Sequence, residues 1–490
     1  MFAFFLSSGL FLGWSLGAND ASNVFGTAVG TRMLRFRTAA IYCSIFVIIG
    51  AVISGAGASH TLGKLGSVNA VAGAFIVAFA AAMSVYLMTL ARYPVSTSQA
   101  IVGAIIGWNL FSGSLTDYNS LTKIVVTWVA CPVLSAFIAV VLYKLIVFCI
   151  KRTKINMFKL DGMTRYGLLL AGMFGSYSLG ANNIANVMGV FVPVSPFSDI
   201  SIFGMFNLTS AQQLFFIGGV AIAVGVFTYS KRVMMTVGEG IIELSPVAAF
   251  VAVWSHSVVL FLFSSQGLEA FLIRHGLPSI PLVPVSSSQA IVGAVIGMGL
   301  LKGGKGIRWR VVGGITTGWI FTPIIAALMS FICLFFLQNV FQQKTYRPVN
   351  YILTIEAMER IRSEGISTDK LNDLFGKDFS TAAGFKKALS EHVTLTSDEQ
   401  DVIMTSAEID EMDVTQERIS KISLDWFTKE QKKALYELEG REFIHKWQLN
   451  EALAEISPQW RFRENDKDYN KNLQNKLSHT YRFFRYETDY

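Results

Sequence analysis

The sequence predicts an all-α polytopic membrane protein: two inverted repeats with broken helices and re-entrant hairpins, then a small, mostly helical soluble C-terminal domain. Three observations support this fold class, namely the composition, an internal duplication and the placement of basic residues. Of the 490 residues, 52% are hydrophobic and only 15% are charged, and the mean hydropathy is +0.46. Such a composition is typical of a chain that crosses a membrane several times.

The charged residues are unevenly distributed. Residues 1–343 contain 19 basic and 7 acidic side chains, a formal charge of +12. Residues 344–490 contain 22 basic and 27 acidic side chains, a formal charge of −5. Because the positive excess lies in loops between apolar spans, it indicates membrane topology, and we expect the lipid bilayer and no nucleic acid as a partner.

Two motifs occur twice, in the same order. GANDASNV begins at Gly17 and returns as GANNIANV at Gly180. PVSTSQAIVGA begins at Pro94 and returns as PVSSSQAIVGA at Pro284. A weaker pair, TLGK and TVGE, lies between them. These ordered pairs predict a duplicated membrane unit, with a first repeat at 1–150, a basic cytoplasmic linker at 151–165, a second repeat at 166–343 and a charged soluble domain at 344–490.

The loop charges give the orientation of the repeats. Apolar spans fall near 3–30, 38–58, 69–92, 98–112, 121–150, 166–192, 211–229, 246–266, 289–301 and 311–341. If the segments around Pro94 and Pro284 are hairpins that return to the side they entered, each repeat crosses the membrane three times. The second repeat is then inverted, and four basic clusters fall on one side, which the positive-inside rule makes cytoplasmic.

The first motif predicts a cation site. Asp20 lies in a span where a carboxylate costs about 2.5 kcal/mol or more and is normally paired or functional, and residues 1–31 contain no basic residue. Gly17 and Gly180 weaken the helix, and the Asn and Asp side chains compete with the backbone for hydrogen bonds. We therefore expect a break in each helix that frees carbonyl and carboxamide groups to ligate a cation.

The second motif predicts an anion site. Its serine and threonine hydroxyls precede helices that begin near Gln99 and Gln289. A helix N-terminus carries about half a positive charge and binds small oxyanions. Inverted repeats with interrupted helices are the architecture of many secondary transporters. The alternatives are an anion channel, although the polar residues cluster instead of lining whole helices, and an enzyme, for which no nucleophile, base or metal set is present.

Five other polar residues are assigned no role in the substrate site. We expect His60 and His256 to be packing or loop residues, because neither belongs to a constellation of ligands. Arg92 is expected to be an interfacial anchor. Glu239 and Glu243, one helical turn apart, are expected to form a structural or gating pair.

The GANDASNVFGT and PVSTSQAIVGA segments and their second copies resemble the signatures of the inorganic phosphate transporter (PiT) family, over about residues 1–343. The resemblance implies an alternating-access symporter of phosphate in the cell (inner) membrane, a homodimer, coupled to sodium or protons and without other cofactors. Carried over position by position, it implies substrate-binding roles for Asn19, Asn182, Ser96, Thr97, Ser98, Gln99, Ser286, Ser287, Ser288 and Gln289. It also implies coupling-ion roles for Asp20, Asn23, Asn183 and Asn186, with sodium at Asp20, Asn23 and Asn186.

One departure bears on the coupling ion and on the substrate. The family usually has Asp in both copies of the first motif, whereas this chain has Asn183 in the second. Sulfate or another small oxyanion is therefore the alternative substrate, but Asp20 can accept the proton of hydrogen phosphate, which sulfate lacks. Gln99 and Gln289 stand where some family members have His, which removes a titratable group.

Overall fold

The computed structural model forms two compact units, one of residues 1–111 and 116–346 and the other of residues 112–115 and 347–490. The structure describes residues 2–66, 68–90, 95–153, 155–197, 200–202, 206–231, 233–234, 244–301, 303–304, 306–393, 395–422, 427–464 and 466–485. The expectations for Arg92, Glu239 and Glu243 fall outside these residues, as do the second copy of the weak motif and the side chain of His60.

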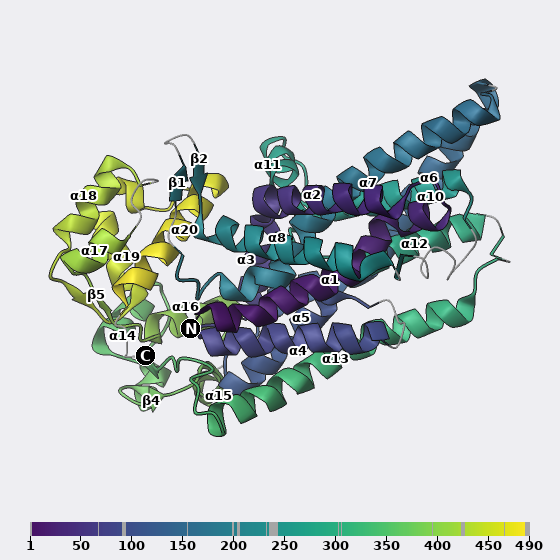
Figure 1. Ribbon diagram of the computed structural model, residues 1–490. Helices are drawn as coiled ribbons and strands as arrows, with labels where there is room; N and C mark the ends of the chain where they lie inside the picture. Colours follow the sequence, from purple (N-terminus) through teal and green to yellow (C-terminus); the bar gives the residue numbers. More distant parts are fainter. Residues whose placement is uncertain are drawn as a thin grey trace. The chain divides into compact units, whose positions relative to one another are not determined.

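The first unit is a bundle of helices (Figure 1). Its first half contains α1 (Phe2–Gly30), α2 (Phe36–Ser54), α3 (Ala56–Leu65), α4 (Val71–Leu90), α5 (Thr97–Ser112) and α6 (Tyr118–Thr153). Its second half contains α7 (Met157–Met188), η1 (Gly189–Phe191), α8 (Ser210–Thr228), α10 (Pro246–Ser264), α11 (Gln266–Arg274), α12 (Ser287–Leu301) and α13 (Trp309–Asn339). Strands β1 (Ile200–Ile202) and β2 (Phe206–Leu208) pair antiparallel between η1 and α8. Seven described helices, α1, α2, α4, α6, α8, α10 and α13, are long and apolar enough to cross a membrane, which confirms the polytopic all-α prediction.

The helices α5 and α12 are too short to span a bilayer and point in opposite directions. Each begins at a serine-rich motif, and 16 and 15 residues give a length of about 24 Å, against about 30 Å for the hydrocarbon core. The Trp108 indole N–H near the end of α5 donates to Thr345 O at 3.1 Å, just beyond the end of α13. The end of α5 thus lies near the C-terminal end of α13, whereas the end of α12 leads into the N-terminal end of α13. The two short helices therefore end at opposite ends of the bundle, as inverted repeats require.

Small residues let helices of the two repeats approach one another closely. A Cβ on Gly50 of α2 would lie 2.0 Å from Tyr177 O of α7, and one on Gly225 of α8 would lie 2.1 Å from Trp14 O of α1. Close contact between backbones at small residues is how helices associate in a membrane, where the lipid gives no hydrophobic drive for association. The pairs α2–α7 and α8–α1, each of which joins one repeat to the other, therefore pack in the same way.

The outer surface of the first unit is apolar along α6 and α13. Large hydrophobic side chains there are more than half exposed, among them Val129, Phe137, Ile320 and Leu328. A soluble protein rarely exposes a contiguous apolar surface of this extent. The surface is that of an integral, multi-pass membrane protein.

The second unit contains two similar modules. The first has β3 (Tyr351–Ile352), α14 (Ile355–Ser363), η2 (Asp369–Leu374), β4 (Asp378–Phe379), α15 (Ala382–His392) and α16 (Ser397–Ala407). The second has β5 (Met412–Asp413), α17 (Gln416–Lys421), α18 (Lys429–Glu437), β6 (Glu442–Phe443), α19 (Lys446–Ile456), η3 (Pro458–Trp460) and α20 (Lys467–Phe484). In each module two short strands pair antiparallel, β3 with β4 and β5 with β6, and each has its own hydrophobic core.

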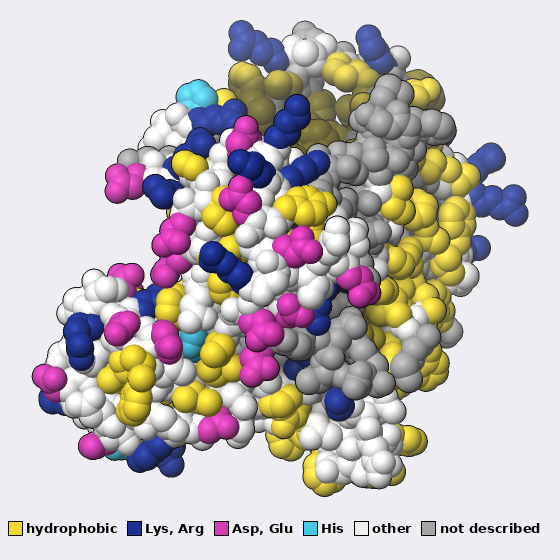
Figure 2. Space-filling view, turned by 90° about the vertical axis from the view of Figure 1, so that its left-hand side faces the viewer, with side chains coloured by type: hydrophobic (Ala, Val, Ile, Leu, Met, Phe, Trp, Pro, Cys, Tyr) yellow, Lys and Arg dark blue, Asp and Glu magenta, His cyan; other side chains and the backbone are white. Residues whose placement is uncertain are grey.

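Local sequence fixes where the helices of the second unit begin. Five of them start after a threonine whose hydroxyl accepts a hydrogen bond from a backbone N–H of the first turn: Thr354, Thr381, Thr396, Thr415 and Thr428. Such caps satisfy one of the free N–H groups at a helix start. Acidic and basic side chains alternate over the face seen in Figure 2, in keeping with the high charge content of this part of the chain.

Candidate functional site

The two copies of the asparagine motif lie in the second half of α1 and in the last turns of α7, and another helix packs closely against each of them. A Cβ on Gly17 would lie 2.0 Å from Ile222 O of α8, and one on Gly180 would lie 2.1 Å from Val47 O of α2. Such a distance to a backbone atom excludes any larger residue unless the helices separate. Both glycines therefore hold the motif against a neighbouring helix.

The expected break at these motifs is wrong. Helix α1 runs from Phe2 to Gly30 and α7 from Met157 to Met188 without interruption. The glycines provide close packing instead of a break, and the Asn side chains donate to groups far away in the sequence. Side chains, and not freed backbone carbonyls, therefore supply the polar groups of the site.

The first asparagine of each motif contacts the hairpin tip of its own repeat. Asn19 Nδ2 donates to Val95 O at 3.3 Å. Asn182 makes two bonds, from its Nδ2 to Val285 O at 2.7 Å and from Val285 N to its Oδ1 at 3.0 Å. The motif and the hairpin of each repeat, predicted separately from the sequence, thus meet in the structure.

The last asparagine of each motif contacts the tip of the other repeat. Asn23 Nδ2 donates to Ser287 Oγ at 3.0 Å, and Asn186 Nδ2 donates to Ser98 Oγ at 2.8 Å. Ser98 Oγ in turn donates to Val285 O at 3.0 Å, which joins the two tips directly. The side chains that we expected to bind the cation therefore lie among those expected to bind the anion.

The tips are the N-termini of α5 and α12. Gln99 N donates to Ser96 Oγ at 3.2 Å, and Gln289 N donates to Ser286 Oγ at 3.3 Å. Ser286 Oγ also lies 3.1 Å from Ser288 Oγ. Ser96 and Ser286 thus act as caps, and the partial positive charges of two helix starts converge on one cluster.

Asp20 is buried in this cluster, with 2% of its surface exposed. Its Oδ1 accepts a hydrogen bond from Asn19 Nδ2 at 3.0 Å. In the second copy, Asn183 Oδ1 accepts from Asn182 Nδ2 at 3.3 Å and from Asn186 Nδ2 at 2.9 Å. The ion pairs within the described part of the chain lie elsewhere, so the carboxylate of Asp20 has no cationic side chain there to balance its charge.

Several buried polar atoms of the cluster have no hydrogen-bond partner among the described residues. They are Thr97 Oγ1, Gln99 Oε1, Gln289 Oε1, Asn183 Nδ2, Asn186 Oδ1 and His256 Nδ1. A buried polar group without a partner costs about 1–3 kcal/mol, so most such groups are satisfied by protein, water or a ligand. The set contains both donors and acceptors, which suits a polar ligand that does both.

The sequence interpretation missed His256. Its side chain is fully buried on α10, and its Nε2 lies 2.9 Å from Ser287 Oγ. The spacing of motifs gave no signal for this contact. The rule that an ionisable residue inside a membrane span is functional by default would have flagged it.

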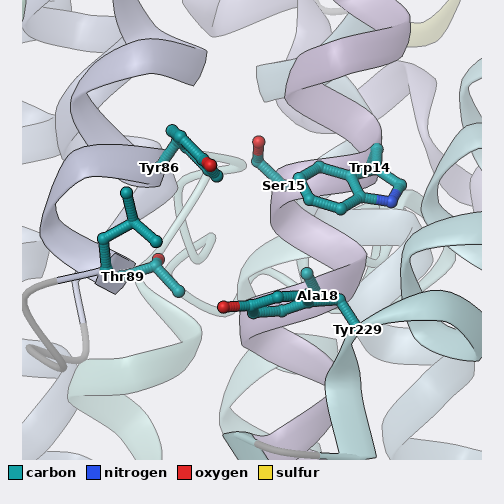
Figure 3. A pocket seen from close by; sticks show the side chains of 7 residues that line it. Trp14, Ser15, Ala18, Tyr86, Thr89 and Tyr229 are labelled. Carbon is teal, nitrogen blue, oxygen red and sulfur yellow. The ribbon is translucent and has the colours of Figure 1, made fainter.

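A small cavity lies close to the cluster but is not the anion site (Figure 3). Trp14, Ser15, Ala18, Tyr86, Thr89, Leu90 and Tyr229 line it, and its volume is about 10 Å³. This volume holds at most one water molecule, and three of the seven lining residues are aromatic. Because Ala18 directly precedes Asn19, the cavity borders the cluster without containing its polar groups.

A family model described as the phosphate transporter family matches residues 16–330 and 279–485. The chain belongs to this family. A putative phosphate permease of Methanocaldococcus jannaschii is 30% identical over 317 residues, covering 65% of this chain and 91% of that protein. One of Haemophilus influenzae is 25% identical and covers 68% of this chain and 96% of its own length. The family supports phosphate transport as the function.

A solved structure, named as the sodium-dependent phosphate transporter, has the same fold. The TM-score is 0.55 at 23% identity, and the match covers 69% of this chain and 99% of that chain. At this identity the likeness concerns the fold of the membrane unit.

Proposed function

We propose that the chain is a secondary active transporter of inorganic phosphate, which moves phosphate together with a cation by alternating access. One observation carries the proposal. Two helix N-termini from opposite repeats and both asparagine motifs meet in one buried cluster, in which several donors and acceptors have no partner among the described residues. Inverted-repeat transporters place their substrate site at such a junction.

The anion half of the site is assigned to the two tips. The hydroxyls of Thr97, Ser98, Ser287 and Ser288 lie at the starts of α5 and α12, where backbone N–H groups and the helix dipoles favour an oxyanion. The caps Ser96 and Ser286 hold these turns in place. Asn19 and Asn182 position the tips through Val95 and Val285.

The cation half is assigned to the oxygens around Asp20. Sodium and other hard cations prefer carboxylate, amide and hydroxyl oxygens, and the Asp20 carboxylate and the Asn23, Asn183 and Asn186 amides supply them. A proton on Asp20 is the alternative, because either ion would neutralise a buried carboxylate that has no basic partner in the described chain. The donor set thus fits sodium or a proton.

Two unpaired acceptors favour phosphate over sulfate. The Gln99 and Gln289 Oε1 atoms occupy matching places in the two tips, and both are buried without a partner in the described structure. Hydrogen phosphate has a P–OH group that donates to such an acceptor, whereas sulfate at neutral pH has only acceptors. Hydrogen phosphate, with one P–OH, can pair with one of the two oxygens, whereas a sulfate ion leaves both unpaired, so sulfate binding is weaker by about 1–3 kcal/mol.

The closure of the site favours a carrier over an anion channel. Each predicted binding side chain, from Asn19 to Gln289, is at most 3% exposed. A carrier passes through a closed state between its outward and inward openings, whereas a conducting channel needs a continuous aqueous path. Saturable uptake that depends on an ion gradient supports the carrier; linear, gradient-independent flux contradicts it.

The test is uptake of radiolabelled phosphate and sulfate into proteoliposomes with an imposed sodium or proton gradient. Ser98→Ala removes a hydroxyl that bridges the repeats. The matched control is Ser255→Ala, which removes a buried hydroxyl whose bond within the described structure is to Val251 O of its own helix. We expect the first to weaken phosphate uptake about 10-fold or more, since a hydrogen bond to a charged group is worth about 1.5–3 kcal/mol. Equal apparent affinity in both variants contradicts the assignment.

We further propose that the chain works as a homodimer in the cell (inner) membrane, as the family resemblance implies. The exposed apolar faces of α6 and α13 are available to lipid and to a second copy alike. Light scattering of the protein in a mild detergent distinguishes a dimer from a monomer.

A further inference from the structure

His256 touches the proposed anion site from a helix that belongs to neither motif. Its Nε2 lies 2.9 Å from Ser287 Oγ, the hydroxyl that also accepts from Asn23 Nδ2. Its Nδ1 is buried and has no partner in the described part of the chain. Helix α4, which precedes the first hairpin as α10 precedes the second, carries no histidine, acidic or basic residue, so this ionisable group belongs to one repeat only.

The proton state of His256 decides what the Ser287 hydroxyl can do. A hydroxyl has one hydrogen and two lone pairs, and Asn23 occupies one lone pair. When Nε2 has no hydrogen, the hydroxyl donates to it and has no hydrogen left for a ligand. When Nε2 carries a hydrogen, this N–H donates to the second lone pair of the Ser287 hydroxyl. The hydroxyl hydrogen must then bond an acceptor other than His256.

Neutral histidine can adopt either tautomer, but protonated histidine cannot. Both of its nitrogens then carry hydrogen, so Nε2 must donate to Ser287 and the hydroxyl hydrogen becomes available to an oxyanion. Protonation also adds a positive charge next to the start of α12. Both effects favour binding of an anion.

Few other titratable groups face His256. Helix α1 contributes Asp20, and α6 contributes the thiol of Cys131, which lies 3.7 Å from Ser286 O. Helix α12 has no ionisable residue, and the charged residues of α7 and α6 and Lys64 of α3 are exposed. Asp20 and Cys131 are therefore the buried titratable groups of the described elements that pack against α10.

We propose that His256 binds a proton whose binding is linked to oxyanion binding through Ser287. This inference rests on the proposed function and names one of its coupling sites. By linkage, a proton on His256 strengthens phosphate binding by the same factor by which phosphate strengthens proton binding, typically about 5- to 150-fold.

The test measures the phosphate affinity of the purified protein by calorimetry from pH 5.5 to 8.5, in buffers of different ionisation enthalpy, which also gives the protons taken up per phosphate. His256→Gln keeps an N–H donor for Ser287 but does not titrate. His275→Gln is the matched control, because His275, directly after α11, is exposed and its ring nitrogens bond only Phe271 O among the described groups. Phosphate has the same protonation equilibrium in every sample, so differences between proteins report the protein.

We expect the wild type and His275→Gln to gain at least about 5-fold more affinity on acidification than His256→Gln, and to take up more protons per phosphate. Ser287→Ala keeps the histidine and its charge but removes the hydrogen-bonded link to the ligand, so it should lose part of this proton uptake. This variant tests the inference if His256→Gln does not fold. Equal proton uptake in the wild type, His256→Gln and Ser287→Ala overturns the inference alone. A folded wild type that binds no phosphate at any pH overturns the proposed function itself.

Discussion

Asn186→Ala tests the contact that joins the second asparagine motif to the first hairpin tip. The wild-type side chain donates to Ser98 Oγ at 2.8 Å and to Asn183 Oδ1 at 2.9 Å. Neither partner is left without a bond, because Ser98 still donates to Val285 O and Asn183 still accepts from Asn182. The variant therefore loses two net hydrogen bonds at about 1 kcal/mol each. This loss of stability is partly offset, because the substitution also removes Asn186 Oδ1, a buried acceptor without a partner among the described residues.

The expected cost to the free energy of unfolding without ligand is thus about 1–2 kcal/mol. Asn109→Ala is a matched control, since Asn109 is also buried and donates to Leu65 O at 3.1 Å and Thr116 Oγ1 at 2.9 Å. It lies on α5 about three helical turns beyond Ser98. Without ligand, the two variants should lose similar stability.

Phosphate separates the two variants. At a concentration of 100 times the wild-type Kd, phosphate stabilises the folded protein by about 2.7 kcal/mol. If Asn186 supports phosphate binding through Ser98 and the coupling cation, a 10-fold weaker Kd reduces this stabilisation to about 1.4 kcal/mol, while Asn109→Ala keeps the full value. Thermal unfolding in detergent, with and without phosphate, measures both quantities. Equal stabilisation of the two variants by phosphate would refute the assignment of Asn186 to the site.

Three further predictions follow from the packing and charge of the membrane unit. Asp20→Asn keeps the shape of the side chain but deletes the buried charge, so gradient-driven uptake should be lost in a protein that still folds; normal uptake with unaltered ion dependence contradicts this. Gly103→Ala places a Cβ 2.1 Å from Pro323 O and should lower the free energy of unfolding by about 1–3 kcal/mol or more. Gly313→Ala, where no described atom lies within 4 Å of the new Cβ, is the control and should leave thermal unfolding nearly unchanged. Cysteines at Thr153 and Arg310 should be labelled by an impermeant reagent from one side of the membrane and a cysteine at Asn339 from the other; labelling of 153 and 310 from opposite sides contradicts the inverted repeats.

The architecture of the membrane unit was predictable because each of its determinants is local in the sequence. Apolar spans, basic clusters and the two copies of PVSTSQ and PVSSSQ indicate the helices and their orientation without knowledge of which helix touches which. The starts of α5 and α12 at Thr97 and Ser287 follow from serine caps of the same kind. The fold class could therefore be derived before any contact was known.

The role of the motif glycines was not predictable in the same way. Glycine weakens a helix and also permits close packing, and the sequence around Gly17 is compatible with both. The choice depends on Ile222, which is brought to Gly17 only by the tertiary fold. The contacts of Ser287 with Asn23 and with His256 could not be predicted for the same reason. The spacing of residues along the sequence does not show which side chains of the two repeats meet.

The single carboxylate of the asparagine motifs leads to a last prediction, about the charge moved in each cycle. A hydrogen phosphate dianion and Asp20 together carry three negative charges, and two helix starts supply about +0.5 each. About two positive charges are then needed for a neutral buried site, since an uncompensated buried charge is strongly unfavourable. One cation at Asp20 and one proton on His256 meet this requirement, and two such charges carried with a dianion make transport electroneutral. Asn183→Asp adds a fourth negative charge and requires a third cation, so its uptake should accelerate when a potassium diffusion potential makes the liposome interior negative, while wild-type uptake should not respond. A wild-type rate that rises with the potential as steeply as that of the variant contradicts this charge count.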